Sequence, residues 1–480
     1  MNFAMVLKNL GTLLICETLA ILPSMIVSFI YKENDIWAFI YTTIILLVIG
    51  IGLLSIKAKN KVLYARDGFA IVAIGWLLIS FFGALPFYFS GAIPSIIDSF
   101  FEASSGFTTT GSSILTNVEA LGYGMLFWRS FTHWVGGMGV LVLTMAILPF
   151  TGSGSIHIMK AESPGPSPGK LVPKVKETAK ILYGIYILIT IVQIILLKLA
   201  GMPMFDALLH SFGTVGTGGF SSKNLSVGAY NNVVVEIIIT VFMLMCGANF
   251  ALYYQGLKGN IKEFFRDEEF KLYMIIVFSS IILIAFNIKG SIFNSMGESI
   301  RYSAFQVASI ITTTGYATTD FNTWPVFSKM ILIFLMFIGG CAGSTGGGIK
   351  NIRILLLLKA AKRDLFKIIH PRATYSVRIG GRAVSEQTLS EVLGFFFMYI
   401  IIFCSLVLIV SIEGMDITTT ITSVAATLGN IGPGLEIVGP MGNFSSFSPI
   451  SKFVLSLGMI IGRLEIYPIL LLMMPRFWMK

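Results

Sequence analysis

Long apolar runs recur along the chain and predict helices that cross a membrane. A helix needs about 20 apolar residues to cross ~30 Å of hydrocarbon. Residues 10–31, with Glu17 as their one charged residue, and residues 453–475, with Arg463 and Glu465, qualify beside the uncharged runs. The uncharged runs are 36–56, 68–97, 130–159, 181–197, 237–257, 272–288, 330–349 and 392–412. The pattern therefore predicts about ten spans.

Between the later spans, the chain carries semi-apolar stretches that are too short to cross the bilayer. Residues 96–107 and 304–311 are examples, and such lengths suit re-entrant helices. Each stretch begins near an acid, which is favourable at a helix N-terminus, and ends in small polar residues around a glycine. The acids are Asp98, Asp206, Glu298 and Asp416.

The glycine-containing loops recur at a nearly constant spacing. Residues 101–111 and 305–315 share six identities in eleven positions. Such regular self-similarity indicates internal duplication, with each repeat made of a span, a pore helix, a glycine loop and a second span. The loops are Thr109-Thr110-Gly111, Thr214-Val215-Gly216, Thr313-Thr314-Gly315 and Asn430-Ile431-Gly432, so their glycines lie 105, 99 and 117 residues apart.

The predicted fold is an all-α membrane protein with four repeats around a central pore, a pseudo-tetramer within one chain, plus an N-terminal hairpin of two spans. The hairpin is expected over residues 1–66. The repeats are expected over 67–165, 166–262, 263–375 and 376–480.

Charge supports a membrane location and sets the expected topology. Only 12% of the 480 residues are charged, against about 25% in a soluble chain. The net charge of +10 would suggest nucleic acid as the partner of a soluble protein, but the basic residues gather in the loops 57–66, 160–180, 258–271 and 353–382. The positive-inside rule then places these loops and both termini in the cytoplasm. We expect lipid, and not nucleic acid, around this chain.

Four irregular loops within the membrane predict a shared, water-filled cavity. Backbone that is neither helix nor sheet cannot face lipid, because each unsatisfied amide would cost several kcal/mol. A ring of backbone carbonyls with threonine hydroxyls nearby can replace the hydration shell of a cation at low charge. The C-terminal ends of four pore helices would add negative dipole at the axis. These features predict a selectivity filter for monovalent cations, most simply K⁺.

Other functions fit the sequence less well. The four histidines are dispersed, and neither H-E-x-x-H nor G-x-S-x-G occurs, so no enzyme is indicated. The glycines and threonines of any one loop could serve helix packing alone. A carrier with a midplane site would need repeats of opposite topology, whereas these four run in the same sense. Coupled symport uses similar filters, so a Na⁺- or H⁺-coupled symporter of the same fold stays open as an alternative to an ion channel.

The sequence resembles the Trk/Ktr/HKT superfamily of K⁺ transporters, and the Trk-type membrane subunit in particular, over essentially the whole chain. The motifs that carry the resemblance are FTTTG at 107–111, WRSFTHWVGGMG at 128–139, GGCAGSTGGGIK at 339–350, NIGPG at 430–434 and GRLE at 462–465. The resemblance implies K⁺ uptake across the plasma membrane of a prokaryote, with K⁺ as the bound ion and no organic cofactor.

By this resemblance, Gly111, Gly216, Gly315 and Gly432 are the filter glycines, and the carbonyls of the residues just before them hold K⁺. Some relatives that pass Na⁺ have serine in the first loop, so Gly111 favours K⁺. All four loops depart from the T-V-G-Y-G pattern of tetrameric K⁺ channels. We therefore expect looser discrimination among K⁺, Rb⁺ and Na⁺.

A second group of residues predicts a gate. Residues 339–348 hold six glycines in ten positions, namely Gly339, Gly340, Gly343, Gly346, Gly347 and Gly348, and this helix propensity is so poor that the span should break there. The family has an intramembrane gating loop at this place. A glycine-rich packing face is the alternative.

Two basic residues belong to this expectation. Arg463 has apolar residues on both sides, and a charge at that depth costs ~3 kcal/mol unless it faces a cavity or a partner. We expect it to bond carbonyls of the 339–348 loop and hold the pore closed, with Glu465 as the alternative partner. Lys350 either shares this role or extends to the inner surface, and the second is the expectation.

Regulation is expected to come from another chain, because little of this one is cytoplasmic. The resemblance implies a cytosolic ring of Rossmann-type RCK subunits that bind NAD or adenine nucleotides, and a dimeric membrane part.

Overall fold

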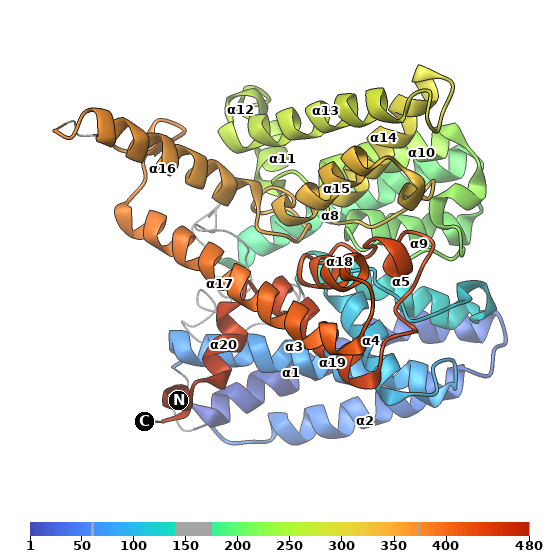
Figure 1. Ribbon diagram of the computed structural model, residues 1–480. Coiled ribbons are helices and arrows are strands. Elements are labelled where there is room, and N and C mark those ends of the chain that lie inside the picture. The colour runs from blue at the N-terminus through green and yellow to red at the C-terminus, as the bar shows by residue number, and fades with distance from the viewer. Residues whose placement is uncertain (59–61, 140–174, 373–374, 480) are drawn as a thin grey trace.

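The computed structural model describes residues 1–58, 62–139, 175–372 and 375–479, and it is helical nearly throughout. The predicted boundary at 165/166 lies outside these residues. Both termini lie at the same end of the molecule, the end from which α16 (Asn351–Ile369) projects (Figure 1). Arg66 donates to the carbonyl of Met479 and the Phe3 ring stacks on Trp478, so the two ends of the chain are in contact.

The N-terminal hairpin consists of α1 (Phe3–Ile30) and α2 (Ile36–Leu54). The two helices pack closely at Gly11, where a Cβ atom would lie 2.8 Å from Cβ of Leu53. Helix α1 also packs against α3 (Ala65–Phe89) and α5 (Tyr123–Gly137) of the first repeat, which fixes the hairpin to the outside of the pore unit (Figure 1).

Each repeat contains a long helix, a short buried helix and a second helix. The first repeat has α3 (Ala65–Phe89), α4 (Ile96–Phe107) and α5 (Tyr123–Gly137), and the second has α8 (Val175–Leu199), α9 (Met204–Val215), α10 (Val233–Cys246), α11 (Phe250–Leu257) and α12 (Lys262–Arg266). The third has α13 (Glu268–Ile288), α14 (Met296–Ile311), α15 (Val326–Ile338) and α16, and the fourth has α17 (Glu386–Val410), α18 (Ile417–Leu428), α19 (Pro449–Arg463), α20 (Tyr467–Met473) and α21 (Pro475–Trp478). Short 3₁₀ helices cover Val118–Ala120, Ser226–Tyr230, Phe321–Thr323, Ser411–Glu413 and Glu436–Val438.

The predicted re-entrant helices are confirmed as α4, α9, α14 and α18, which have 12, 12, 16 and 12 residues. Side chains cap two of them at the N-terminus: Ser95 accepts from the N–H of Asp98, and Asp416 accepts from the N–H of Thr419. Such caps satisfy amides that a helix leaves unpaired in its first turn.

The second helix of the second, third and fourth repeats is less regular than the sequence suggests. Six helices among the described residues are long and apolar enough to span a membrane: α1, α2, α3, α8, α13 and α17. The pair α10 and α11 bends by 95° and counts as a seventh only if it is one span. The predicted span 330–349 is broken after Ile338, and the predicted span 453–475 is broken after Arg463. The number of ten spans stays a prediction.

A two-stranded ribbon follows α16. Strands β1 (Arg378–Ile379) and β2 (Arg382–Ala383) pair antiparallel, with Arg378 opposite Ala383 and Ile379 opposite Arg382. Gly380 and Gly381 between them have φ of +55° and +78°, as a tight hairpin turn with two left-handed residues requires.

Candidate ion filter and gate

The four loops that follow the pore helices share one backbone conformation. In each loop the helix cap is followed by a residue with φ between +54° and +57°, and two residues later by a glycine with φ between +80° and +101°. The first positions are Thr109, Thr217, Thr313 and Asn430, and the glycines are Gly111, Gly219, Gly315 and Gly432.

The loops also share their hydrogen bonds to the pore helices. The N–H of Thr110 donates to Ser105 O at 2.9 Å, and the N–H of Thr314 donates to Ser309 O at 2.8 Å. The corresponding bonds in the second and fourth loops run from Gly218 to Gly213 O and from Ile431 to Ala426 O, at 2.7 and 2.9 Å. Each helix thus ends in the same tight cap, which turns the chain into the loop.

In the second loop, the residues that share the common backbone conformation lie three positions after those predicted from the sequence. Thr214 and Val215 are the last residues of α9, and Gly216 is its cap with φ of −73°. Gly219, with φ of +80°, has the conformation that the other three glycines share. The fourfold correspondence therefore runs through Gly219.

Contacts between the loops close a ring and support this correspondence. A Cβ atom built on Gly111 would lie 2.1 Å from the carbonyl oxygen of Gly218, and one on Gly219 would lie 2.0 Å from that of Thr314. One on Gly315 would lie 2.2 Å from Ile431 O, and one on Gly432 would lie 2.9 Å from Thr110 O.

In every case the glycine of one repeat touches the carbonyl just before the glycine of the next repeat. The loops therefore form a closed ring in which four glycines alternate with four carbonyls, and no side chain fits at the glycine positions.

Side-chain hydrogen bonds stabilise the ring, some within one loop and one between two loops. The hydroxyls of Thr108 and Thr110 lie 2.7 Å apart, and those of Thr312 and Thr314 lie 2.8 Å apart. Asn430 donates through Nδ2 to Thr110 Oγ1 at 2.9 Å. Threonine residues in these loops are buried, so their hydroxyls face protein or the pore, and not bulk solvent.

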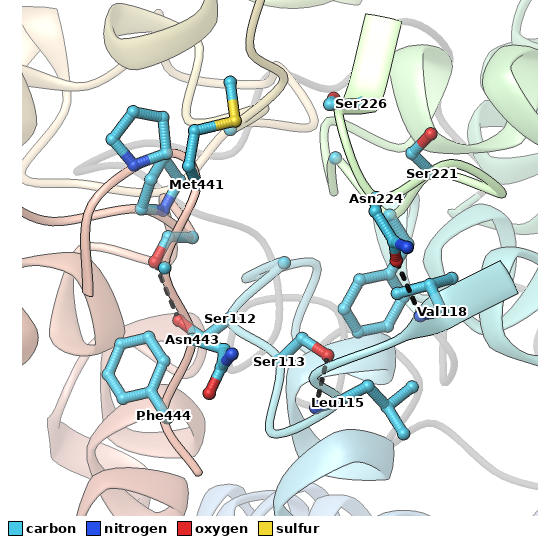
Figure 2. Close-up of a pocket in the computed structure, with 18 of the residues that line it drawn as sticks. Ser112, Ser113, Leu115, Val118, Ser221, Asn224, Ser226, Met441, Asn443 and Phe444 are labelled. Atoms are coloured by element: carbon cyan, nitrogen blue, oxygen red, sulfur yellow. Dashed lines mark hydrogen bonds between the residues drawn. The ribbon is translucent and has the colours of Figure 1, made fainter. Parts of the chain in front are cut away.

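A hollow of about 150 Å³ lies at the far end of the filter loops. Figure 2 shows Ser112, Ser113 and Leu115 of the first loop across from Asn224 and Ser221 of the second, with Met441, Asn443 and Phe444 of the fourth on the remaining side. Its volume holds a few waters at ~30 Å³ each. It is smaller than the roughly 300–1,000 Å³ of sites for organic ligands.

The predicted break in the third repeat is present. Helix α15 ends at Ile338 and α16 begins at Asn351, and the segment between them, which we call the 339–348 loop, lies against the start of the filter. The N–H of Gly347 donates to Thr313 Oγ1 at 2.6 Å. A Cβ atom on Gly346 would lie 2.8 Å from Thr312 O, and one on Gly347 would lie 2.5 Å from Gly429 O.

Neighbouring elements hold this loop in place. The N–H of Cys341 donates to Gly247 O at 2.8 Å, where α10 and α11 bend apart. Buried Glu269, at the start of α13, accepts from the N–H groups of Ala342 at 2.6 Å and Ile352 at 3.0 Å, the first inside the glycine run and the second after it. Each end of the loop thus has a fixed partner.

Arg463 makes the contact expected of it. Its Nη1 donates to Thr345 O at 2.8 Å, and its Nη2 donates to the carbonyls of Gly136 and Gly137 at 2.6 and 2.8 Å. Arg463 therefore joins the fourth repeat to the 339–348 loop and to the C-terminal end of α5, where a cation is favourable. The alternative partner, Glu465, is instead bound by Arg353 through two bonds of 3.0 and 2.6 Å.

The expectation that Lys350 extends to the inner surface is wrong. Its side chain is 2% exposed, and its ammonium donates to the carbonyl of Gly346 within the loop. The backbone at Lys350 has φ of +82°, which turns the side chain back into the loop. Lys350 and Arg463 thus bind carbonyls of the same segment.

The comparisons place the chain among cation transporters. A family model described as TrkH, cation transport protein, matches residues 36–480. The chain belongs to the TrkH family. Two relatives named Trk system potassium uptake protein TrkH, from Salmonella typhimurium and Escherichia coli K12, are 40% and 39% identical over the whole length of both chains. The crystal structure of the potassium transporter TrkH from Vibrio parahaemolyticus superposes with a TM-score of 0.89 at 36% identity, again over both whole chains.

Three site residues escaped sequence reasoning. The sequence did not single out Gly219 as the filter glycine, because residues 216–219 contain three glycines. A usable signal was the match between the first two repeats, since Asp98 and Asp206 both lie 13 residues before Gly111 and Gly219. The acids of the third and fourth repeats lie 17 and 16 residues before their glycines. Glu102 and Arg129, which pair behind the filter, were each a charge within an apolar stretch.

Proposed function

We propose that this TrkH-family protein takes up K⁺ across the plasma membrane of a prokaryote, through a filter formed by the four glycine loops. The observation that carries the proposal is the closed ring in which glycines of one repeat touch carbonyls of the next. The names of the relatives, which are potassium uptake proteins, support K⁺ as the ion.

The chemistry of the ring suits a monovalent cation. Carbonyl oxygens replace water ligands without adding full charge, so an ion is bound and released again. The ends of α4, α9, α14 and α18 contribute negative dipole at the ring. Of the described residues that line the outer hollow, none is a carboxylate, so trapping of an ion at that mouth is not favoured.

The 339–348 loop acts in this proposal as the gate. It lies across the start of the third and fourth filter loops, and its carbonyls hold two cationic side chains, Lys350 and Arg463. A positive charge near the ion path opposes cation passage, so the arrangement corresponds to a closed pore. Opening would require the loop to leave Arg463 and Thr313.

Regulation and assembly complete the proposal. We infer a cytosolic RCK-domain subunit that binds nucleotide, and a homodimer of the membrane part, with both termini in the cytoplasm. The relatives are named as parts of a Trk system, and α16 with its hairpin projects from the end that carries both termini (Figure 1). This projection offers a surface through which another chain could reach the gate.

The filter is tested by Rb⁺ uptake into proteoliposomes that contain the purified chain, with K⁺, Na⁺ and choline as competitors. Gly315→Ala should abolish uptake, because its Cβ would lie 2.2 Å from Ile431 O. Gly297→Ala is the matched control, since the nearest atom to its Cβ is 3.6 Å away on the same pore helix. Equal uptake by wild type and Gly315→Ala would remove the filter assignment.

A further inference from the structure

A buried ion pair lies directly behind the first two filter loops. Arg129 Nε of α5 and Glu102 Oε1 of α4 are 2.6 Å apart, and the two side chains are 4% and 0% exposed. Buried charges are rare unless they are paired and hydrogen-bonded. Arg129 belongs to the 128–139 motif, in which Gly136 and Gly137 accept from Arg463, but Arg129 itself takes part neither in the filter ring nor in the gate contacts.

Glu102 holds the chain that leaves the first filter glycine. Its carboxylate accepts from Ser113 Oγ at 2.9 and 3.1 Å and from the N–H of Ile114 at 3.0 Å. These residues follow Gly111 by two and three positions. The pore helix thus binds the outer part of the loop that follows it.

Arg129 holds the chain that leaves the second filter glycine. Its Nη1 donates to Ser221 O at 3.1 Å, and its guanidinium carbon lies 3.5 Å from the centre of the Phe220 ring. Phe220 and Ser221 directly follow Gly219. A single ion pair therefore connects the outer parts of two neighbouring loops.

The other repeats have no such charge at the matching position. The residues nine positions before the filter glycines are Glu102, His210, Gln306 and Ser423. His210 Nε2 lies 3.0 Å from Ser221 Oγ, and Gln306 Nε2 lies 3.5 Å from Thr318 Oγ1. This position of the pore helix therefore contacts the segment that leaves the filter in the first three repeats. Only in the first repeat is the residue a carboxylate, and that carboxylate also pairs with a cation of the following helix.

Charge balance at the mouth gives the pair a second effect. Arg129 lines the outer hollow through which ions would pass. With Glu102 beside it, its charge is compensated. If one partner were neutralised, an uncompensated charge would remain at the hollow or directly behind it, and salt would screen it only weakly because both side chains are buried.

We propose that Glu102 and Arg129 are specificity-determining residues that clamp the first and second filter loops at the spacing suited to K⁺, and that Glu102 compensates the charge of Arg129 at the outer mouth. The proposal rests on the proposed function as a filter. It makes separate predictions for two measurable quantities. The clamp determines the selectivity for K⁺ over Na⁺, and the charge balance determines the apparent KM.

The test is Rb⁺ uptake with Na⁺ as competitor, in proteoliposomes of the full chain. Glu102→Gln, Arg129→Gln and the double variant should each become several-fold more sensitive to Na⁺, because each loosens the clamp. Glu102→Gln should raise the apparent KM for Rb⁺ at low salt, and Arg129→Gln should lower it. The double variant should return the KM toward wild type but not the selectivity.

A second ion pair in the same chain provides the control. Glu236 of α10 and Arg301 of α14 are 3.4 Å apart, with side chains 6% and 25% exposed, and their described contacts reach no filter loop. Glu236→Gln and Arg301→Gln should leave Na⁺ competition unchanged. Arg129→Lys keeps the charge but loses the planar fork of the guanidinium, so this variant should keep the wild-type KM and lose selectivity. It replaces Arg129→Gln in the test if Arg129→Gln does not fold.

The outcomes distinguish the clamp from the filter. If Gly315→Ala abolishes uptake but the double variant competes with Na⁺ as wild type does, the clamp is wrong and the filter stands. If Gly315→Ala has no effect, the filter itself is wrong. If Glu236→Gln and Arg301→Gln change selectivity as strongly as the Glu102 and Arg129 variants, a general loss of packing explains the effect and the clamp is overturned.

Discussion

Three of the four filter loops hold a threonine in the left-handed region of backbone space. Thr109, Thr217 and Thr313 have φ of +54°, +54° and +57°, a conformation that is strained for a β-branched residue. Asn430, which tolerates it better, occupies the fourth position. Strain of this kind persists only where the surroundings over-determine the conformation. Here the caps of the pore helices and the contacts around the ring supply that constraint.

The reassignment of the second loop leads to a prediction about single residues. Gly219→Ala should strongly reduce Rb⁺ uptake, because its Cβ would lie 2.0 Å from Thr314 O and its φ is +80°. Val215→Ala, within α9, should leave a small cavity and cost about 1–2 kcal/mol of stability, with selectivity unchanged. Uptake and Na⁺ competition, measured at equal amounts of monodisperse protein, check both. Normal Gly219→Ala uptake would contradict the reassignment.

The sequence predicted the filter better in some loops than in others, for a physical reason. Gly315 and Gly111 are isolated glycines after three threonines, so the position that must have positive φ is unambiguous. In the second loop, several glycines compete for that position, and only contacts with the next repeat decide among them. The partner of Arg463 is likewise set by tertiary contacts, because Glu465 lies only two residues away in sequence but is bound by Arg353.

At the scale of elements, the second helix of the second, third and fourth repeats is interrupted. Helix α10 bends into α11, α15 breaks at the 339–348 loop, and α19 ends at Arg463 before α20 begins. Composition foretold the break in the third repeat, because glycines are dense there. The break after Arg463 has no such signal: Glu465 and Ile466 adopt φ of +54° and +72° without a glycine, and long-range contacts impose it.

Arg463→Ala should raise basal Rb⁺ uptake in the absence of any regulatory subunit. The substitution removes three bonds to carbonyls, including the one to Thr345 in the 339–348 loop, and removes a positive charge near the ion path. Arg266→Ala, at an exposed site on α12, is the control. Unchanged or reduced uptake, with wild-type amounts of folded protein, would disprove the role of Arg463 in holding the gate closed.

At the scale of the whole molecule, the ring has a seam between the fourth and first repeats. A Cβ atom built on the glycine there would lie 2.9 Å from the facing carbonyl oxygen, compared with 2.0–2.2 Å at the other three junctions. Two side-chain bonds cross this seam: Asn430 Nδ2 to Thr110 Oγ1 at 2.9 Å, and Ser112 Oγ to Gly432 O at 2.9 Å. Side chains thus compensate where backbone contact is loosest.

Ser112→Ala should weaken the seam. The loss of one buried hydrogen bond costs about 1 kcal/mol, and we expect a lower thermal midpoint in detergent. Ser279→Ala is the control, because its hydroxyl bonds only within its own helix turn, to Ile276 O. If both variants melt as wild type does, the bond from Ser112 does not contribute to closing the ring.

The ring of four loops in one chain has a consequence for how its properties can be varied. In a homotetramer, one codon change alters all four corners of the filter at once. Here Gly111, Gly219, Gly315 and Gly432 are encoded separately, so one substitution alters a single corner and leaves three intact. Selection, and the experimenter, can therefore change one corner of the filter at a time.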